Sequence, residues 1–380
     1  MVAFIRHIPP SEARGRLAHV YREIRSDVPR VPNLMQVFSL RPETMTGIYR
    51  SWLSSMWNGR VPRRSKELLA VAVSKAAACD YCVDAHLVYL QATGMDAAKT
   101  YEIEQRMAEA SSLTPAERVA VGFAVRITSD PRSVAPEHLA ALAGAWPDTE
   151  ERVEILTVMS ALNTITRICN GLGVTLEIPF AVRRFNAGRK GAIALMSRLT
   201  ALGLDFSAKA VPVRAPEENR HAGESLYLGQ LGFPALPPGF EQMESSPELL
   251  DGQLRLMEKA VAVVPRDRWM RIGLVVSRLV GCSYFADNCA QWLAQGGAEP
   301  DAVVAASEGA ATSLPEAERA CLRFVRDLTL HSHTIGEERI KELRMVGLSD
   351  GAILDVAFVG GLFNGVARLI ATVGGSGQGS

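Results

Sequence analysis

Four side chains suited to thiol chemistry lie between residues 67 and 86: Glu67, Cys79, Cys82 and His86. Two residues separate the cysteines, and His86 follows the second cysteine by four positions. On a helix, this spacing places thiol and imidazole on one face, so His86 could take the proton of Cys82. Glu67, on the preceding predicted helix, could orient that imidazole or relay its proton. The spacing therefore predicts a thiol-based active site.

Cys79 is expected near the start of the helix that carries Cys82. The helix dipole and the unpaired N–H groups there favour a thiolate. A thiolate could attack the O–O bond of a peroxide and become a sulfenic acid, which the neighbouring thiol would resolve as a disulfide. Position on the helix favours Cys79 as the thiolate, whereas a shared face with His86 favours Cys82.

Other interpretations of the cysteine pair stay open. Zinc would need four ligands, and the two thiolates with His86 and Glu67 could supply them, although no second Cys/His pair has suitable spacing. The two thiols could instead be buried structural residues, which is the interpretation of Cys169 and Cys321. We expect a site without metal or cofactor.

Three polar residues are candidate auxiliary groups. Tyr81 lies between the two cysteines and is interpreted as a packing residue before an acid. Asn163 and Arg167 belong to a long helix predicted from Glu150 to about Leu172. They could pack helices, contact another subunit or contact the substrate.

The composition indicates an ordinary globular protein. Of 380 residues, 48% are hydrophobic and 22% charged, which is too apolar for disorder and enough for two domains. Forty-one basic and forty-one acidic residues balance, so we expect no nucleic-acid or membrane-surface partner. No secretion-signal pattern begins the chain, and no run of about 18 uncharged apolar residues occurs. We expect a cytoplasmic protein, where reducing conditions favour a reactive cysteine pair over a structural cross-link.

Helical patterning predicts an all-α fold. Apolar residues recur at three- and four-residue spacing, and runs of β-branched residues between tight turns are missing. Helices are predicted over 9–27 and 82–91, and an apolar segment runs from about 34 to 57 between them. A further helix is predicted to begin with Thr114 as N-cap and Pro115 at its first position.

Two segments repeat along the chain at nearly constant spacing. SKAAACDYCVDAH at 74–86 aligns with SRLVGCSYFADNC at 277–289, 203 residues later, and AERVAVGFAVR at 116–126 aligns with 317–327 at a spacing of 201. This order predicts a tandem duplication. The predicted parts are a first domain at 1–185, a connecting segment at 186–224, a degenerate second domain at 225–372 and a flexible tail at 373–380.

The second copy lacks the reactive set. Met270, Phe285 and Cys289 stand where the first copy has glutamate, the second cysteine and histidine. Cys282 and Cys289 are also poor partners for each other, because seven helical residues rise about 10 Å and a disulfide allows roughly 7 Å between Cα atoms. The second copy is expected to be structural or to form a pocket wall.

The complete pattern E-x11-C-x-x-C-x3-H resembles the active-site pattern of the alkylhydroperoxidase AhpD-like proteins of the carboxymuconolactone decarboxylase superfamily. Flanking segments share the resemblance, which covers nearly all of the first half and weakly extends to the second. These segments are Val31–Leu34, Leu113–Arg118 and the helix with Asn163 and Arg167.

The resemblance implies an all-helical fold that forms homo-oligomers. It also implies that Cys82 attacks the peroxide, that Cys79 resolves the product, and that Glu67 and His86 relay protons. Family members are re-reduced by a dithiol carrier such as a lipoyl domain or a thioredoxin-like protein. The best-known peroxidases carry a histidine where this chain has Tyr81, and the decarboxylases lack the dithiol.

The leading hypothesis is a thiol-dependent peroxidase or thiol–disulfide oxidoreductase acting on a small-molecule hydroperoxide or a disulfide. One alternative is a specialised biosynthetic enzyme that transforms a single small metabolite on the same fold. Another is a non-enzymatic redox sensor that oxidises once and changes partners. A narrow pocket beside Cys82, walled by both halves, would favour a dedicated substrate.

Overall fold

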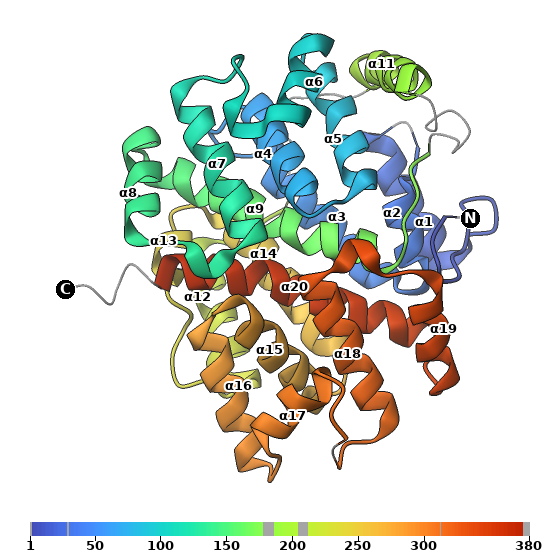
Figure 1. Ribbon diagram of the computed structural model, residues 1–380, viewed down its shortest axis with the longest axis vertical. Helices are drawn as coiled ribbons and strands as arrows, with labels where there is room; N and C mark the ends of the chain where they lie inside the picture. The colour runs from blue at the N-terminus through green and yellow to red at the C-terminus, as the bar shows by residue number, and fades with distance from the viewer. Residues whose placement is uncertain (1, 29, 178–185, 204–211, 312, 375–380) are drawn as a thin grey trace.

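Every regular element among the described residues is a helix (Figure 1). The computed structural model describes residues 2–28, 30–177, 186–203, 212–311 and 313–374. The all-α class is therefore confirmed. The predicted boundary at 185 and most of the predicted tail lie outside these ranges.

Helices of the first half run from α1 to α9 in chain order. They are α1 (Gly15–Asp27), α2 (Asn33–Val37), α3 (Pro42–Trp57), α4 (Arg63–Ala76), α5 (Asp80–Ala92), α6 (Ala97–Arg106), α7 (Pro115–Ser129), α8 (Pro136–Ala145) and α9 (Thr149–Gly171).

The remaining helices begin with two in the predicted connecting segment. They are α11 (Asn186–Gly203), α12 (Pro216–Glu224), α13 (Phe240–Met243), α14 (Pro247–Val263), α15 (Arg266–Val280), α16 (Ser283–Gln295), α17 (Pro300–Ser307), α18 (Glu316–Leu330), α19 (Glu337–Met345) and α20 (Asp350–Gly374).

Local sequence explains where several helices begin. α7 has the predicted cap: Thr114 Oγ1 accepts the Glu117 N–H at 3.2 Å, and the Glu117 carboxylate accepts the Thr114 N–H at 2.9 Å. The apolar segment at 34–57 is divided into α2 and α3. Pro42 forces this break, because the residue before a proline is disfavoured in the helical region, and Arg41 has φ −139°.

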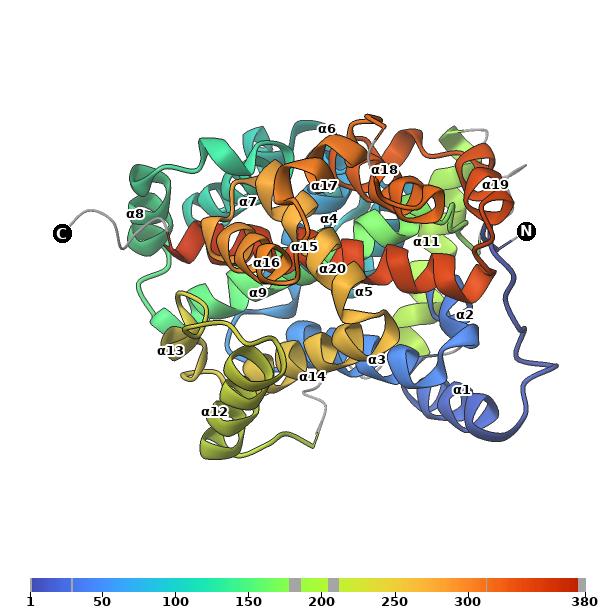
Figure 2. The ribbon, with the colours of Figure 1, turned by 90° about the horizontal axis from the view of Figure 1, so that it is seen from below.

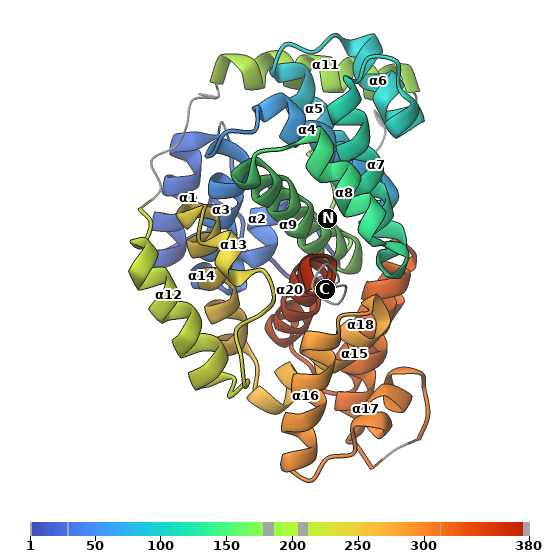
Figure 3. The same ribbon diagram turned by 90° about the vertical axis from the view of Figure 1, so that its left-hand side faces the viewer.

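The two halves repeat one packing scheme. α4 packs on α5, α7 and α9, and α15 packs correspondingly on α16, α18 and α20. The halves meet where α9 lies along α20 and α3 lies along α14, which is clearest in Figure 3. This correspondence supports the proposed duplication, which stays a prediction.

A matched asparagine supports the same proposal. Asn163 Nδ2 donates to Thr128 Oγ1 at 3.1 Å and to a carbonyl one turn earlier in α9. Asn364 Nδ2 donates to Thr329 Oγ1 at 3.0 Å and to the equivalent carbonyl of α20. Asn163 therefore links α9 to α7, so these contacts explain the residue by helix packing.

The α9–α20 contact is close enough to require glycine on α20. A Cβ at Gly365 would overlap Thr164 Oγ1 and the Ser160 carbonyl. The same helix, over Asp350–Val373, is long and apolar enough to cross a membrane, with a mean hydropathy of 1.7 in an 18-residue window. Because 89% of that window is buried within the protein, its place in the core explains its composition.

The predicted connecting segment holds α11, which covers the outer face of α5 (Figure 2). The Arg189 guanidinium fastens it, with Nε donating to Asp84 at 2.7 Å and Nη2 to Glu104 at 2.9 Å. Asp84 is buried on the helix that carries Cys82. α11 thus anchors the cysteine helix from outside.

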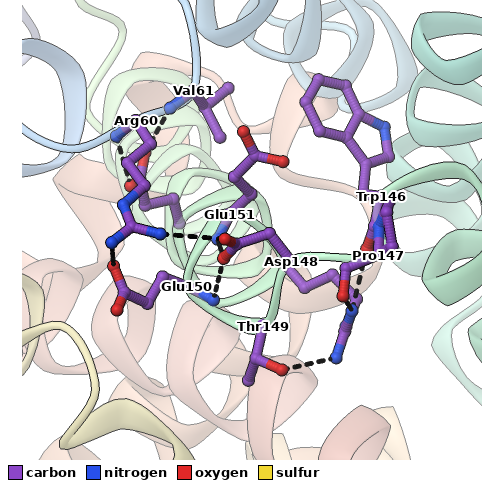
Figure 4. A network of polar contacts seen from close by, with 10 residues as sticks. Arg60, Val61, Trp146, Pro147, Asp148, Thr149, Glu150 and Glu151 are labelled. Carbon is purple, nitrogen blue, oxygen red and sulfur yellow. Dashed lines mark hydrogen bonds and ion pairs between the residues drawn. The ribbon is translucent and has the colours of Figure 1, made fainter.

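A polar network fixes α9 against the chain entering α4 (Figure 4). Arg60 pairs with Asp148 at 2.9 Å and with Glu150 at 3.0 Å. The Glu154 carboxylate accepts the backbone N–H groups of Arg60 and Val61 at 2.6 and 2.9 Å. The network therefore holds α9, which carries Arg167 and Cys169, in register with α4, which carries Glu67.

Candidate active site

The cysteine pair lies at the turn between α4 and α5. Cys79 is the N-cap of α5, and its Sγ accepts the backbone N–H of Cys82 at 3.4 Å. Ala78, just before it, has φ +50°, a left-handed conformation that is uncommon for a residue other than glycine. Asn170 of α9 donates to the Ala77 carbonyl at 3.0 Å and so holds the turn.

The structure brings a third thiol to this pair. Cys79 Sγ and Cys82 Sγ are 2.7 Å apart, and Cys169 Sγ lies within 4.8 Å of both. All three are buried, with exposures of 0%, 2% and 1%. Cys169 is a core residue as predicted, but its contact with the pair was missed. The sequence carries no signal for it, because the contact arises from the packing of α9 on α4 and α5.

The two thiols of the pair have opposite proton affinities. Burial raises the pKa of Cys79, but hydrogen bonds from Cys169 and Cys82 outweigh burial and hold that pKa well below its ordinary value. Burial and the same contacts raise the pKa of Cys82 well above its ordinary value. Before substrate binds, the negative charge of the pair therefore lies on Cys79, which is the assignment predicted by its place at the helix start.

A buried cation accompanies the thiols. Arg167 is fully enclosed on α9; it donates to the Thr128 carbonyl at 3.3 Å and to Thr166 Oγ1 at 3.2 Å, and its Nε has no hydrogen-bond partner among the described residues. Burial lowers the pKa of Arg167 to about 10, while negative charge on Cys79 and Cys82 opposes that shift. Arg167 thus remains a cation at neutral pH and favours a thiolate in the cluster.

Glu67 and His86 form a direct pair. Glu67 Oε2 lies 2.7 Å from His86 Nδ1. Burial raises the pKa of Glu67, but the charges of Arg63 and His86 outweigh it, so the net shift is downward and Glu67 is ionised. A carboxylate only accepts hydrogen bonds, so Nδ1 carries the proton. Nε2 is then the nitrogen left for chemistry.

Arg63 is a site residue that the sequence interpretation missed. Its Nε donates to Glu67 Oε1 at 2.7 Å, and its guanidinium lies 3.6 Å from the centre of the Trp57 ring. The two oxygens of Glu67 are therefore divided between Arg63 and His86. The spacing of Arg63 and Glu67, four residues apart on one helix, was the available signal.

An apolar cavity of about 80 Å³ lies beside Cys82 and His86. Cys79 does not line it, so substrate in the cavity would meet Cys82 first. Leu256, from α14, brings the second half into the wall. The other principal side chains that line the cavity are Leu34, Met35, Ile48, Tyr49, Trp52, Met56, Tyr81, Tyr89, Leu162 and Ile165.

The auxiliary candidates separate into different environments. Tyr81 lines the cavity, and its hydroxyl accepts the Leu34 N–H at 3.4 Å. Burial raises the pKa of Tyr81 well above its ordinary value, so the phenol keeps its proton. Arg167 lies beside the thiols, whereas Asn163 serves helix packing.

In the second half, aromatic rings fill the matching region. Phe285, at the position of Cys82, packs edge-on against Phe363 at 5.2 Å between ring centres. Met270 is fully buried, and burial raises the pKa of Cys282 to about 11. The region therefore offers packing in place of thiol chemistry. The rings around Phe285 are Phe233, Trp269, Tyr284 and Phe363.

Residues 42–126 match the family model of the carboxymuconolactone decarboxylase family. The matched region contains Glu67, Cys79, Cys82 and His86, the four residues of the motif in the first half. Cys169 lies outside it.

Two curated proteins are similar to part of the chain. Alkyl hydroperoxide reductase Rv2159c of Mycobacterium tuberculosis (strain ATCC 25618 / H37Rv) is 35% identical over 94 residues, which cover 24% of this chain and 27% of that protein. Uncharacterized protein YdfG of Bacillus subtilis (strain 168) is 27% identical over 119 residues, 30% of this chain and 76% of that protein. The chain thus spans only about a quarter of the mycobacterial relative.

One solved structure is also similar. It is described as the alkylhydroperoxidase AhpD core, an uncharacterized peroxidase-related protein from Ralstonia eutropha JMP134. The match has a TM-score of 0.43 and 18% identity, and it covers 47% of this chain and 93% of that structure.

Proposed function

We propose that this protein is a thiol-dependent peroxidase that reduces small apolar hydroperoxides. The observation that carries the proposal is that Cys82 borders an apolar cavity beside His86, with a second thiol 2.7 Å behind it. The similarity to a protein named an alkyl hydroperoxide reductase supports the same reaction class.

In the proposed reaction, the Cys82 thiolate attacks the outer oxygen of R–O–OH. The O–O bond breaks, Cys82 becomes a sulfenic acid, and the alkoxide takes a proton and leaves as the alcohol. Cys79 then attacks the sulfenic sulfur, an S–S bond forms, and hydroxide leaves as water. A dithiol reductant, such as a lipoyl or thioredoxin-like protein, returns both thiols by exchange.

Two observations bear differently on which cysteine attacks. The lowered pKa of Cys79 favours that residue, whereas access from the cavity favours Cys82. We assign the attack to Cys82, because a thiolate without contact with the substrate cannot react. The 2.7 Å contact places Cys79 to attack the sulfenic sulfur once it has formed on Cys82.

His86 acts in this scheme as the base and acid facing the cavity. Its Nδ1–H is held by Glu67, so Nε2 can accept the Cys82 proton and later pass it to the leaving alkoxide. Because Arg63 keeps Glu67 ionised, the Glu67 carboxylate can accept the Nδ1–H and so orient the imidazole. Arg63 and Glu67 are therefore positioning residues.

Cavity size narrows the substrate class. The volume is about 80 Å³, compared with roughly 150 Å³ for an engineered cavity that binds benzene. A compact group such as tert-butyl fits this space better than a phenyl ring. We therefore expect tert-butyl hydroperoxide to be a better probe than cumene hydroperoxide.

Truncating Leu256 should change this preference. Leu256→Ala enlarges the cavity, so kcat/KM for cumene hydroperoxide relative to tert-butyl hydroperoxide should rise about tenfold. Leu254→Ala is the matched control, because Leu254 is equally buried on α14 but lines a separate cavity of about 40 Å³. Equal ratios in the two variants would refute a role of the second half in specificity.

The small cavity walled by both halves also favours a second candidate, an enzyme dedicated to one apolar metabolite. A panel of hydroperoxides separates the two: comparable kcat/KM values across small members support a peroxidase, and activity with none of them supports the dedicated enzyme.

We further propose a cytoplasmic homo-oligomer, because thiols need reducing surroundings and the family resemblance implies assembly.

The direct test of the proposed function is turnover of tert-butyl hydroperoxide with dihydrolipoamide as reductant. Many equivalents of alcohol per protein are expected. A single equivalent would indicate a one-time sensor, and consumption no faster than in buffer would refute the proposal.

A further inference from the structure

We propose that Cys169 is a second resolving thiol, able to form a disulfide with Cys82 in place of Cys79. The inference rests on the proposed function and deepens it, since it gives the sulfenic acid two alternative partners. It arises from the three-thiol cluster, of which the recognised motif contains only two members.

Distance is the first support. Cys169 Sγ lies within 4.8 Å of the other two sulfurs, and a disulfide needs about 2.05 Å. One change of cysteine rotamer moves Sγ by about 3 Å, which covers the difference. Cys169 also approaches from α9, whereas Cys79 approaches from the turn before α5, so the two need not displace each other.

A metal ion would fit this cluster less well. With metal–sulfur bonds near 2.3 Å, two thiolates on one tetrahedral ion are about 3.8 Å apart. The sulfurs of Cys79 and Cys82 are only 2.7 Å apart, so they would have to separate by about 1 Å. The spacing favours sulfur–sulfur bond formation.

The proton balance of the step closes within the cluster. Burial raises the pKa of Cys169 well above its ordinary value, so Cys169 brings its own proton to the reaction. Its sulfur attacks the sulfenic sulfur of Cys82, the S–O bond breaks, and hydroxide leaves with the thiol proton as water. The cation of Arg167, two residues away on α9, stabilises negative charge that develops on the sulfurs.

The test uses the full chain with Cys79→Ser, a substitution that keeps a good helix N-cap. The reduced variant is treated with one equivalent of tert-butyl hydroperoxide or, separately, with diamide, and is then mapped by mass spectrometry without reduction. A Cys82–Cys169 disulfide is expected in both arms. In the peroxide arm, the double variant Cys79→Ser/Cys169→Ser should accumulate a sulfenic acid at Cys82, which is detected by trapping with dimedone. Cys79→Ser/Cys321→Ser, which removes a buried thiol elsewhere, should behave like the single variant.

The arms separate the two proposals. A Cys82–Cys169 disulfide that forms with diamide but not with tert-butyl hydroperoxide supports the pairing and refutes the peroxidase proposal. A free Cys169 after both treatments overturns the inference, whatever happens at Cys82. Should Cys79→Ser fail to fold, the oxidised wild type decides: a disulfide that contains Cys169 supports the inference, and only Cys79–Cys82 contradicts it.

Discussion

Replacing Cys82 by serine should reduce kcat/KM for tert-butyl hydroperoxide roughly 1,000-fold or more, as expected when a nucleophile is removed. A serine hydroxyl is not ionised at neutral pH, and it cannot form the sulfenic acid or the disulfide. The change is one atom in a buried position on α5, so the fold should persist. Turnover and circular dichroism are measured on the same samples.

Cys321→Ser is the control for this variant. Cys321 is also buried, but it lies on α18 outside the three-thiol cluster. The Cys321→Ser variant should keep the wild-type kcat/KM, although its loss of stability should be comparable to that of Cys82→Ser. Wild-type turnover by Cys82→Ser would transfer the attack to another residue, with Cys79 the first candidate because of its lowered pKa.

Glu67→Gln should lower the free energy of unfolding by about 3 kcal/mol, the scale found when one partner of a buried ion pair is removed. Glu67 is fully buried between Arg63 and His86, and glutamine preserves shape but not charge. The measurement is urea unfolding at neutral pH. Loss of imidazole orientation should also lower kcat about 100-fold, the lower end of general acid–base effects.

The stability lost in Glu67→Gln should depend on pH. The folded-state pKa of Glu67 is lowered, so its contribution to stability is complete above the unfolded value, about 4.3, and disappears as pH falls through the lower folded value. The stability difference between wild type and Glu67→Gln should therefore shrink below about pH 4. A difference that grows on acidification would contradict the ionised assignment.

Glu43→Gln is the matched control for charge loss. Glu43 pairs with Arg16 at 2.8 Å, but the two side chains are 59% and 47% exposed. Exposed pairs contribute roughly 0–1 kcal/mol, so this variant should unfold almost as the wild type does. An equal loss in both variants would show that burial of Glu67 is not the cause.

Local rules predicted the helical class and the closeness of Cys79 and Cys82. The cap at Thr114 and the position of Cys79 at the start of α5 follow from a few neighbouring residues. The break at Pro42 also has a local cause, but apolar periodicity on both sides concealed it. Such features depend on residues that are near in sequence, where the physical rules are short-range.

Apart from Arg63, which lies one turn before Glu67 on α4, the missed features come from packing between distant helices. Cys169 reaches the thiol pair because α9 packs on α4 and α5, and Leu256 reaches the cavity because α14 lies on α3. The internal repeat indicated that two halves exist, yet not which faces meet. Spacing along the chain does not contain that information.

The measurement that tests the central claim most directly is stoichiometric oxidation of the reduced wild type. One equivalent of tert-butyl hydroperoxide is added without reductant, and the alcohol, the free thiols and the peptide map are determined. The account predicts one equivalent of tert-butanol, loss of two thiols, and Cys82 in a disulfide. Unconsumed peroxide, or oxidation that leaves Cys82 as a free thiol, would contradict it.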